Sequence, residues 1–221
     1  MIRRTHSSGT SGRSIFRATA RACHDGPTAG QVSGIVEGMD AVDRALVAHP
    51  REGFLRERNR SRAAYDGPLE IGHGQTNSQP RTVVAMLRLL AVRPGHHVLD
   101  VGAGSGWTTA LLAHLVGPTG SVVGVELEPE LVAFGSANLA ATEQPWARIV
   151  EASEGELGRP AEAPYDRVLV SAMPPSLPGD LVDQLADDGV MVIPVDGEML
   201  RVTNPDGVVT HHGRYSFVPL R

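Results

Sequence analysis

The sequence predicts a doubly wound α/β fold, in which helices cover both faces of a mostly parallel sheet. Between residues 98 and 195, short apolar runs alternate with amphipathic helical segments, as parallel strands and their crossover helices do. A glycine-rich turn follows the first of these strands, where a sheet of this kind binds its ligand. The chain has 221 residues, 41% of them hydrophobic, which suffices for a buried core. We expect one domain over residues 34–221, preceded by a flexible tail, residues 1–33, rich in Ser, Thr, Gly and Arg.

A helical and loop extension is expected before the sheet. From residue 34 onward, apolar side chains share one helical face, namely Ile35, Met39, Val42, Leu46 and Val47. Residues 50–79 are rich in glycine, proline and charge, which favours loops and short elements. Residues 80–92 are expected to form a helix, because Pro80 suits a first helical turn and the RPG sequence at 93–95 ends the pattern.

The sheet itself follows in a regular order. Its strands are expected at 98–101, 121–127, 147–150, 166–172 and 190–195, and its helices at 107–116, 129–141 and 179–187. Two further strand-like runs, MLRVTN and GRYSFVPL, are separated by the turn sequence NPDG. We therefore expect an antiparallel hairpin at the C-terminal end of the sheet.

Composition excludes several classes of function. Cys23 is the single cysteine, so no intrachain disulfide or cysteine metal site is expected, and a cytoplasmic location is the simplest interpretation. The sequence contains no lysine, which excludes a lysine nucleophile. A formal net charge of -5 gives no general reason to expect nucleic acid as a partner. The longest apolar runs have the length of strands, so no membrane span is expected.

The glycine-rich turn reads DVGAGSG at residues 100–106 and has the spacing G-x-G-x-G. Dinucleotide enzymes use G-x-G-x-x-G, but here Trp107 occupies the position of the third glycine. The observed spacing is typical of methyltransferases that use S-adenosylmethionine. The candidate cofactor residues of this turn are Asp100, Gly102, Gly104, Ser105 and Gly106.

Glu126 lies near the end of the strand predicted after this turn. A carboxylate at that position can accept hydrogen bonds from both hydroxyls of an adenosine ribose. Trp107 is interpreted as a packing residue. His211 and His212 are adjacent histidines, but they are not interpreted as a metal site, because no further ligands accompany them in the sequence.

Residues 65–80, YDGPLEIGHGQTNSQP, resemble the segment that precedes the cofactor loop in protein-L-isoaspartate O-methyltransferases. PREGF at 50–54, APYD at 163–166, SAMPP at 171–175 and FVPL at 217–220 are similar to further segments of that family, in the same order. The resemblance implies a Rossmann-like methyltransferase fold and S-adenosylmethionine as cofactor. It also implies, as the reaction, methylation of the free α-carboxylate of L-isoaspartyl residues in proteins or peptides, which serves protein repair.

The resemblance also implies roles for individual residues. It assigns the serine of the T-x-S-x-P segment, Ser78, to the active site, with Thr76 and Asn77 lining the methyl donor under a lid formed by this segment. Glu154 and Gly155 replace the family's G-D-G motif near the adenine. A simpler interpretation makes Ser78 the N-cap of the following helix.

The chemistry explains why no catalytic triad or metal cluster is recognisable. A carboxylate acceptor is ionised at neutral pH, so the enzyme needs no general base and acts by positioning the reactants. His73 is interpreted mainly as a structural or solvent-exposed residue, and less readily as a substrate contact.

Two departures from the family pattern leave the acceptor open. Asn77 replaces a common isoleucine, and residues 194–200 are shorter than usual. They motivate one alternative, a dedicated enzyme that methylates aspartate or isoaspartate in a biosynthetic precursor peptide. Other acceptors, or a non-catalytic module that binds S-adenosylmethionine, are further alternatives. The oligomeric state has no signature in the sequence.

Overall fold

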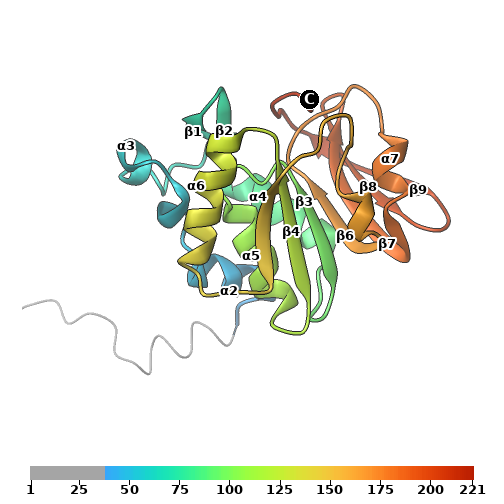
Figure 1. The fold of residues 1–221 in the computed structure, drawn as a ribbon, viewed down its shortest axis with the longest axis horizontal. Coiled ribbons are helices and arrows are strands. Elements are labelled where there is room, and N and C mark those ends of the chain that lie inside the picture. The colour runs from blue at the N-terminus through green and yellow to red at the C-terminus, as the bar shows by residue number, and fades with distance from the viewer. Residues whose placement is uncertain (1–37) are drawn as a thin grey trace, which may run out of the picture. The chain divides into compact units, whose positions relative to one another are not determined.

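The central sheet has seven strands in the order β5-β4-β3-β6-β7-β8-β9 (Figure 1). The protein is represented by a computed structural model that describes residues 38–221, and Met39–Arg221 form one unit. The flexible tail predicted at 1–33 and the apolar position Ile35 lie outside the described residues. The strands are β3 (His97–Val101), β4 (Ser121–Glu126), β5 (Ala147–Glu151), β6 (Tyr165–Val170), β7 (Leu185–Val195), β8 (Glu198–Thr203) and β9 (Val208–Arg214).

The predicted sheet, mostly parallel with antiparallel strands at its C-terminal end, is confirmed. Strands β5, β4, β3, β6 and β7 pair in parallel, whereas β7–β8 and β8–β9 pair antiparallel. The connection direction reverses between β3 and β6, because β4 and β5 extend the sheet to one side and β7 to the other. A ligand site is therefore expected beyond the carboxyl ends of β3 and β6.

The two faces of the sheet are covered differently. One face packs against helices α4 (Pro80–Leu90), α5 (Trp107–Val116) and α6 (Pro129–Ala140), and α2 (Ala41–Ala48) packs on α4 and α5. The opposite face packs against the short α7 (Gly179–Val182) and against loop residues such as Leu157 and Leu177. Side chains of β3 alternate between these layers, with Val98 in the first and Leu99 in the second, as the twofold strand periodicity requires. Among residues 38–221, no helix is long and apolar enough to span a membrane.

The helix predicted over 179–187 is wrong in length, because it ends at Val182. Gln184 is 3% exposed, and its side chain bonds to the carbonyl oxygens of Leu157 (2.8 Å) and Asp180 (2.7 Å). Its own carbonyl oxygen accepts a hydrogen bond from the amide of Tyr165, and Leu185 then pairs with that residue as the start of β7. The chain therefore enters the sheet where the amphipathic pattern predicted another helical turn.

The second strand of the C-terminal hairpin is also placed differently from the prediction. It spans Val208–Arg214 and follows the NPDG turn directly, with Thr203 opposite Val208, so it precedes most of the predicted GRYSFVPL run. Residues 215–221 instead return to the carboxyl end of the sheet. There the amide of Met173 donates to Val218 O (2.8 Å) and the amide of Leu220 donates to Met173 O (3.0 Å).

The predicted loop region before the sheet contains short regular elements: η1 (Arg51–Phe54), α3 (Glu57–Arg60), β1 (Leu69–Gly72) and β2 (Gln75–Asn77). Strands β1 and β2 pair antiparallel and form a hairpin separate from the main sheet. At its tip, His73 and Gly74 have positive φ angles of 55° and 69°. A further 3₁₀ turn, η2 (Pro160–Glu162), precedes β6.

Candidate functional site

A cavity of about 590 Å³ lies at the carboxyl ends of the central strands, where the direction of the connections reverses. This volume is typical of a site for a small organic ligand. Its wall is built from six separate stretches of the chain, within residues 71–78, 101–108, 125–127, 152–158, 171–180 and 218–221. The C-terminal stretch contributes because residues 215–221 turn back toward the sheet instead of forming a strand.

The structure brings most of the predicted site residues together in this cavity. Asp100 and Gly106 lie outside its wall, and the predicted residues that line it are Thr76, Asn77, Ser78, Gly102, Gly104, Ser105, Glu126, Glu154 and Gly155. The segment containing Ser78 and the glycine-rich turn therefore bound the same space, although they come from different parts of the fold.

The glycine-rich turn depends on positive φ angles. Gly102 and Gly104 have φ angles of 80° and 53°, and both face the cavity. Gly106 has a φ of 83°, and a Cβ atom there would lie 2.7 Å from the carbonyl oxygen of Gly135 in α6. The first two glycines therefore leave the backbone open to a ligand, whereas Gly106 permits the close approach of α6 to the start of α5.

Glu126 is the carboxylate that fixes this turn. It is 7% exposed, and its Oε2 accepts a hydrogen bond from the amide of Gly104 at 2.8 Å. Its Oε1 accepts from the amides of Leu127 (2.8 Å) and Glu128 (3.1 Å). A carboxylate has about four lone-pair sites, so after these three bonds Glu126 keeps acceptor capacity toward the cavity. The residues present thus fit a ligand that carries hydroxyl groups.

Asp100 lies behind the turn and is completely buried. Its Oδ2 accepts hydrogen bonds from the hydroxyls of Thr108 (2.8 Å) and Thr109 (2.7 Å) in the first turn of α5. Its Oδ1 has no hydrogen-bond partner among the described residues. Burial raises the pKa of this carboxyl to about 6, against the lowering effect of the two hydroxyls. Asp100 therefore joins β3 to the start of α5 without reaching the cavity.

Ser78 follows β2 directly and lies at the entry to α4. The N-cap of that helix is Gln79, whose own side chain makes no capping hydrogen bond, so the interpretation of Ser78 as the N-cap is wrong. Asp66 serves the helix start instead, because its Oδ1 accepts from the amide of Arg81 at 3.2 Å and its Oδ2 pairs with the Arg81 guanidinium. The side chain of Ser78 is therefore not required for capping.

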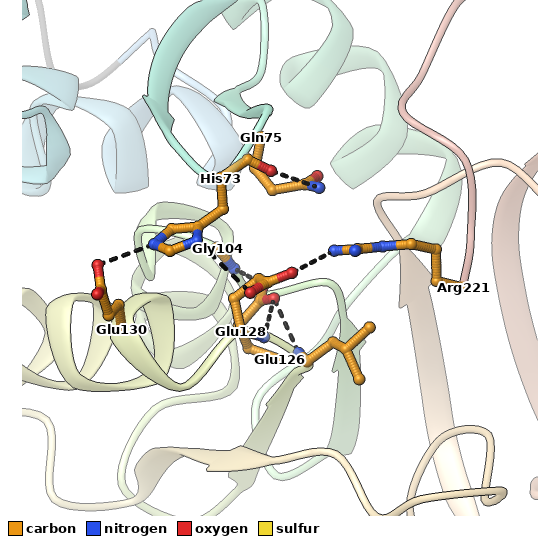
Figure 2. A network of polar contacts seen from close by, with 8 residues as sticks. His73, Gln75, Gly104, Glu126, Glu128, Glu130 and Arg221 are labelled. Carbon is orange, nitrogen blue, oxygen red and sulfur yellow. Dashed lines mark hydrogen bonds and ion pairs between the residues drawn. The ribbon is translucent and has the colours of Figure 1, made fainter.

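A network of polar contacts joins the β1–β2 hairpin to the rim of the cavity (Figure 2). The Nε2 atom of His73 lies 2.8 Å from Glu130 Oε2, and its Nδ1 atom lies 3.6 Å from Glu128 Oε2. Arg221, at the other end of the chain, contacts Glu128 Oε1 at 2.6 Å. His73 is thus a structural contact, in line with its main interpretation from sequence. The acids at 128 and 130 and Arg221 were missed, because no local motif marks a contact between segments so distant in sequence.

Trp107 packs in the core, as its interpretation from sequence expected. It is 3% exposed, and its Nε1 donates to the carbonyl oxygen of His49 at 3.0 Å. Residues 38–221 contain no group of three or more His, Cys, Asp or Glu side chains placed to hold a metal ion.

Comparison with known proteins decides the family. The sequence profile of the protein-L-isoaspartate(D-aspartate) O-methyltransferase family matches residues 31–220. The chain belongs to this family. The protein-L-isoaspartate O-methyltransferase of Methanopyrus kandleri is 45% identical over 186 residues, which cover 81% of this chain and 82% of the relative. That of Aeropyrum pernix is 43% identical over 195 residues, covering 85% of this chain and 75% of the relative.

The fold of this family member is also similar to that of a solved structure. It is a Plasmodium falciparum protein described as a protein-L-isoaspartate O-methyltransferase, in complex with S-adenosyl-L-homocysteine. The two chains are 26% identical with a TM-score of 0.73, and the match covers 86% of this chain and 94% of the other.

Proposed function

We propose that the protein transfers the methyl group of S-adenosylmethionine to the free α-carboxylate of L-isoaspartyl residues in proteins or peptides, as a repair enzyme. The observation that carries the proposal is the single cavity in which the Ser78 segment and the glycine-rich turn face the same space. Membership of the family and close relatives of that name support it.

The cofactor side of the cavity is assigned to the turn after β3 and the acids near it. S-adenosylmethionine would supply an electrophilic methyl group bound to a sulfonium. The open backbone at Gly102 and Gly104 would lie against it, and Glu126 would accept hydrogen bonds from its ribose hydroxyls. Glu154 and Gly155, which line the cavity in the loop after β5, would contact the adenine end.

The acceptor side is assigned to the segment after β1. The substrate carboxylate is ionised at neutral pH, so the protein has to orient it and does not have to deprotonate it. The Ser78 hydroxyl would donate a hydrogen bond to one carboxylate oxygen, while Thr76 and Asn77 line the path to the methyl donor. The hairpin above the cavity would exclude water from the reacting atoms.

The proposed reaction defines the substrates, and the composition of the chain bears on the location. The substrates would be isoaspartyl proteins and peptides in the cytoplasm, a setting that the single cysteine suits. The net charge of -5 gives no electrostatic footprint for nucleic acid or for an anionic membrane surface.

The test is to incubate the protein with methyl-labelled S-adenosylmethionine and matched peptides that contain either isoaspartate or aspartate. We expect base-labile label only in the isoaspartyl peptide, and a fall in kcat of about 10- to 100-fold in Ser78→Ala, because one orienting hydrogen bond is lost. Ser61→Ala is the matched control, since Ser61 is exposed and lies outside the cavity wall.

Two results would contradict the proposal. Equal labelling of both peptides would show that the linkage is not recognised. Binding of S-adenosylhomocysteine without labelling of either peptide would exclude general repair and direct the search to a dedicated precursor peptide.

A further inference from the structure

Arg51 is a buried cation whose hydrogen-bond partners among residues 38–221 are all neutral. It is 5% exposed and begins the turn η1, on the extension that precedes the hairpin. Its Nε donates to the side-chain oxygen of Asn77 at 2.6 Å. Its two terminal nitrogens donate to carbonyl oxygens at 2.8–3.0 Å, those of Tyr65, Gly67, Asn77 and Ser78. The Arg51 guanidinium therefore binds both ends of the segment that contains Ser78, the residue proposed to orient the substrate carboxylate.

Asn77 continues this contact into the cofactor loop. Its side-chain nitrogen donates to the Ser105 hydroxyl at 2.9 Å, and both residues are buried, at 4% and 3% exposed. Ser105 is itself fixed, because its carbonyl oxygen accepts from the side chain of Asn138 in α6 at 2.9 Å. A continuous chain of hydrogen bonds thus runs from Arg51 through Asn77 to Ser105.

The guanidinium also contacts the helix that follows the cofactor loop. Its central carbon lies 5.7 Å from the centre of the Trp107 ring, within the range of a cation–π contact. Burial lowers the pKa of Arg51 to about 10, so the side chain still carries its charge at neutral pH. Arg51 therefore contacts the acceptor segment and the first residue of α5 at the same time.

We propose that Arg51 and Asn77 are positioning residues that hold the acceptor segment at a fixed distance from the cofactor loop. This inference rests on the proposed function, in which the carboxylate is held by one of these segments and the methyl donor by the other. An in-line transfer depends steeply on that separation, since a misplacement of about 1 Å can lower the rate about 100-fold. The side-chain amide of Asn77 makes the direct link between them.

The variants change the two residues of the hydrogen bond between Asn77 and Ser105. Asn77→Leu keeps the branched shape of the side chain and removes both of its hydrogen bonds, whereas Ser105→Ala removes only the link to the cofactor loop. Asn77→Asp keeps an acceptor for Arg51 and can accept a hydrogen bond from Ser105, so it is the conservative variant. Arg58→Ala is the control, because Arg58 is an exposed arginine of the same extension that pairs only with Glu70 among the described residues.

Kinetics on the isoaspartyl peptide give the first readout. We expect Asn77→Leu and Ser105→Ala each to lower kcat by about 10-fold or more, with less than about threefold change in KM for the peptide. The double variant should be no slower than the slower single variant, because both remove the same link. Asn77→Asp should recover most of the activity. A kcat of Asn77→Leu within about threefold of wild type, or additive losses in the double variant, would overturn the inference.

Hydrogen exchange gives a readout that does not depend on turnover. Binding of S-adenosylhomocysteine should slow amide exchange in β2 and at Ser78 in the wild-type protein, and this slowing should be lost in Asn77→Leu. An equal slowing in both proteins would overturn the inference. If the wild-type protein labels no isoaspartyl peptide, the proposed function fails, and hydrogen exchange alone then decides whether the link exists.

Discussion

The buried carboxyl of Asp100 is expected to make the stability of the protein depend on pH. In the folded protein its pKa is raised from 3.8 to about 6, chiefly by burial. The folded state therefore holds the proton more tightly than the unfolded state, and folding gains stability at low pH that is lost as the pH rises through about 4 to 6. A shift of about two units corresponds to about 3 kcal/mol when complete, and to roughly 2 kcal/mol between about pH 4 and pH 7.

Asp100→Asn separates this effect from every group that both proteins share. The amide oxygen can still accept hydrogen bonds from the hydroxyls of Thr108 and Thr109, but the side chain no longer ionises. Its NH₂ group takes the place of an oxygen without a partner, which adds a penalty that does not vary with pH.

The assay is urea unfolding of both proteins, followed by circular dichroism across this pH range. The stability of the wild-type protein relative to Asp100→Asn should fall by about 2 kcal/mol from about pH 4 to pH 7. A difference between the two proteins that is constant with pH would refute the buried, proton-binding state of Asp100.

Two further predictions concern contacts around the cavity. Gly106→Ala should lower the free energy of unfolding by about 2–4 kcal/mol, because alanine is strained at a φ of 83° and its Cβ would lie 2.7 Å from Gly135 O. Gly207→Ala, with a φ of 62° and open space around it, should lower it by only about 1 kcal/mol; equal losses in urea unfolding would contradict this reasoning. His73→Gln should speed release of S-adenosylhomocysteine up to about fivefold in stopped-flow experiments, because an exposed polar contact such as that between His73 and Glu130 contributes at most about 1 kcal/mol. An unchanged release rate in His73→Gln would show that the hairpin contact does not restrain the ligand.

The parallel part of the fold could be predicted because buried strands and their helices leave a strong local pattern. Prediction failed where a long-range contact overrode that pattern. The segment around Gln184 has a helical period, but the buried side-chain bonds of Gln184 and the pairing of Leu185 with Tyr165 draw the chain into β7. The exposed strand β9 has no buried face among its residues, so its sequence carries no alternation that could have identified it.

The same distinction between local patterns and long-range contacts applies to the residues of the site. The glycine-rich turn and Glu126 belong to one compact motif, so their spacing sufficed to place them together. In the sequence, Arg51 could be noted only as part of the family-like PREGF segment. Its role could not be predicted, because it depends on carbonyl oxygens up to 27 residues away in sequence. Arg221 and Glu128, separated by 93 positions, meet only because the chain after β9 returns to the cavity. Contacts of this kind form only in the folded chain, so no local sequence pattern marks them.

The choice of the protein among several carboxylates in one molecule is the property to measure first. A single synthetic peptide can carry an isoaspartyl residue, an ordinary aspartate, a glutamate and a free C-terminal carboxylate. After incubation with the protein and S-adenosylmethionine, tandem mass spectrometry locates the added methyl group. We expect the ester only on the α-carboxylate of the isoaspartyl residue. An ester on the aspartate, the glutamate or the C-terminus, at a comparable rate, would contradict it.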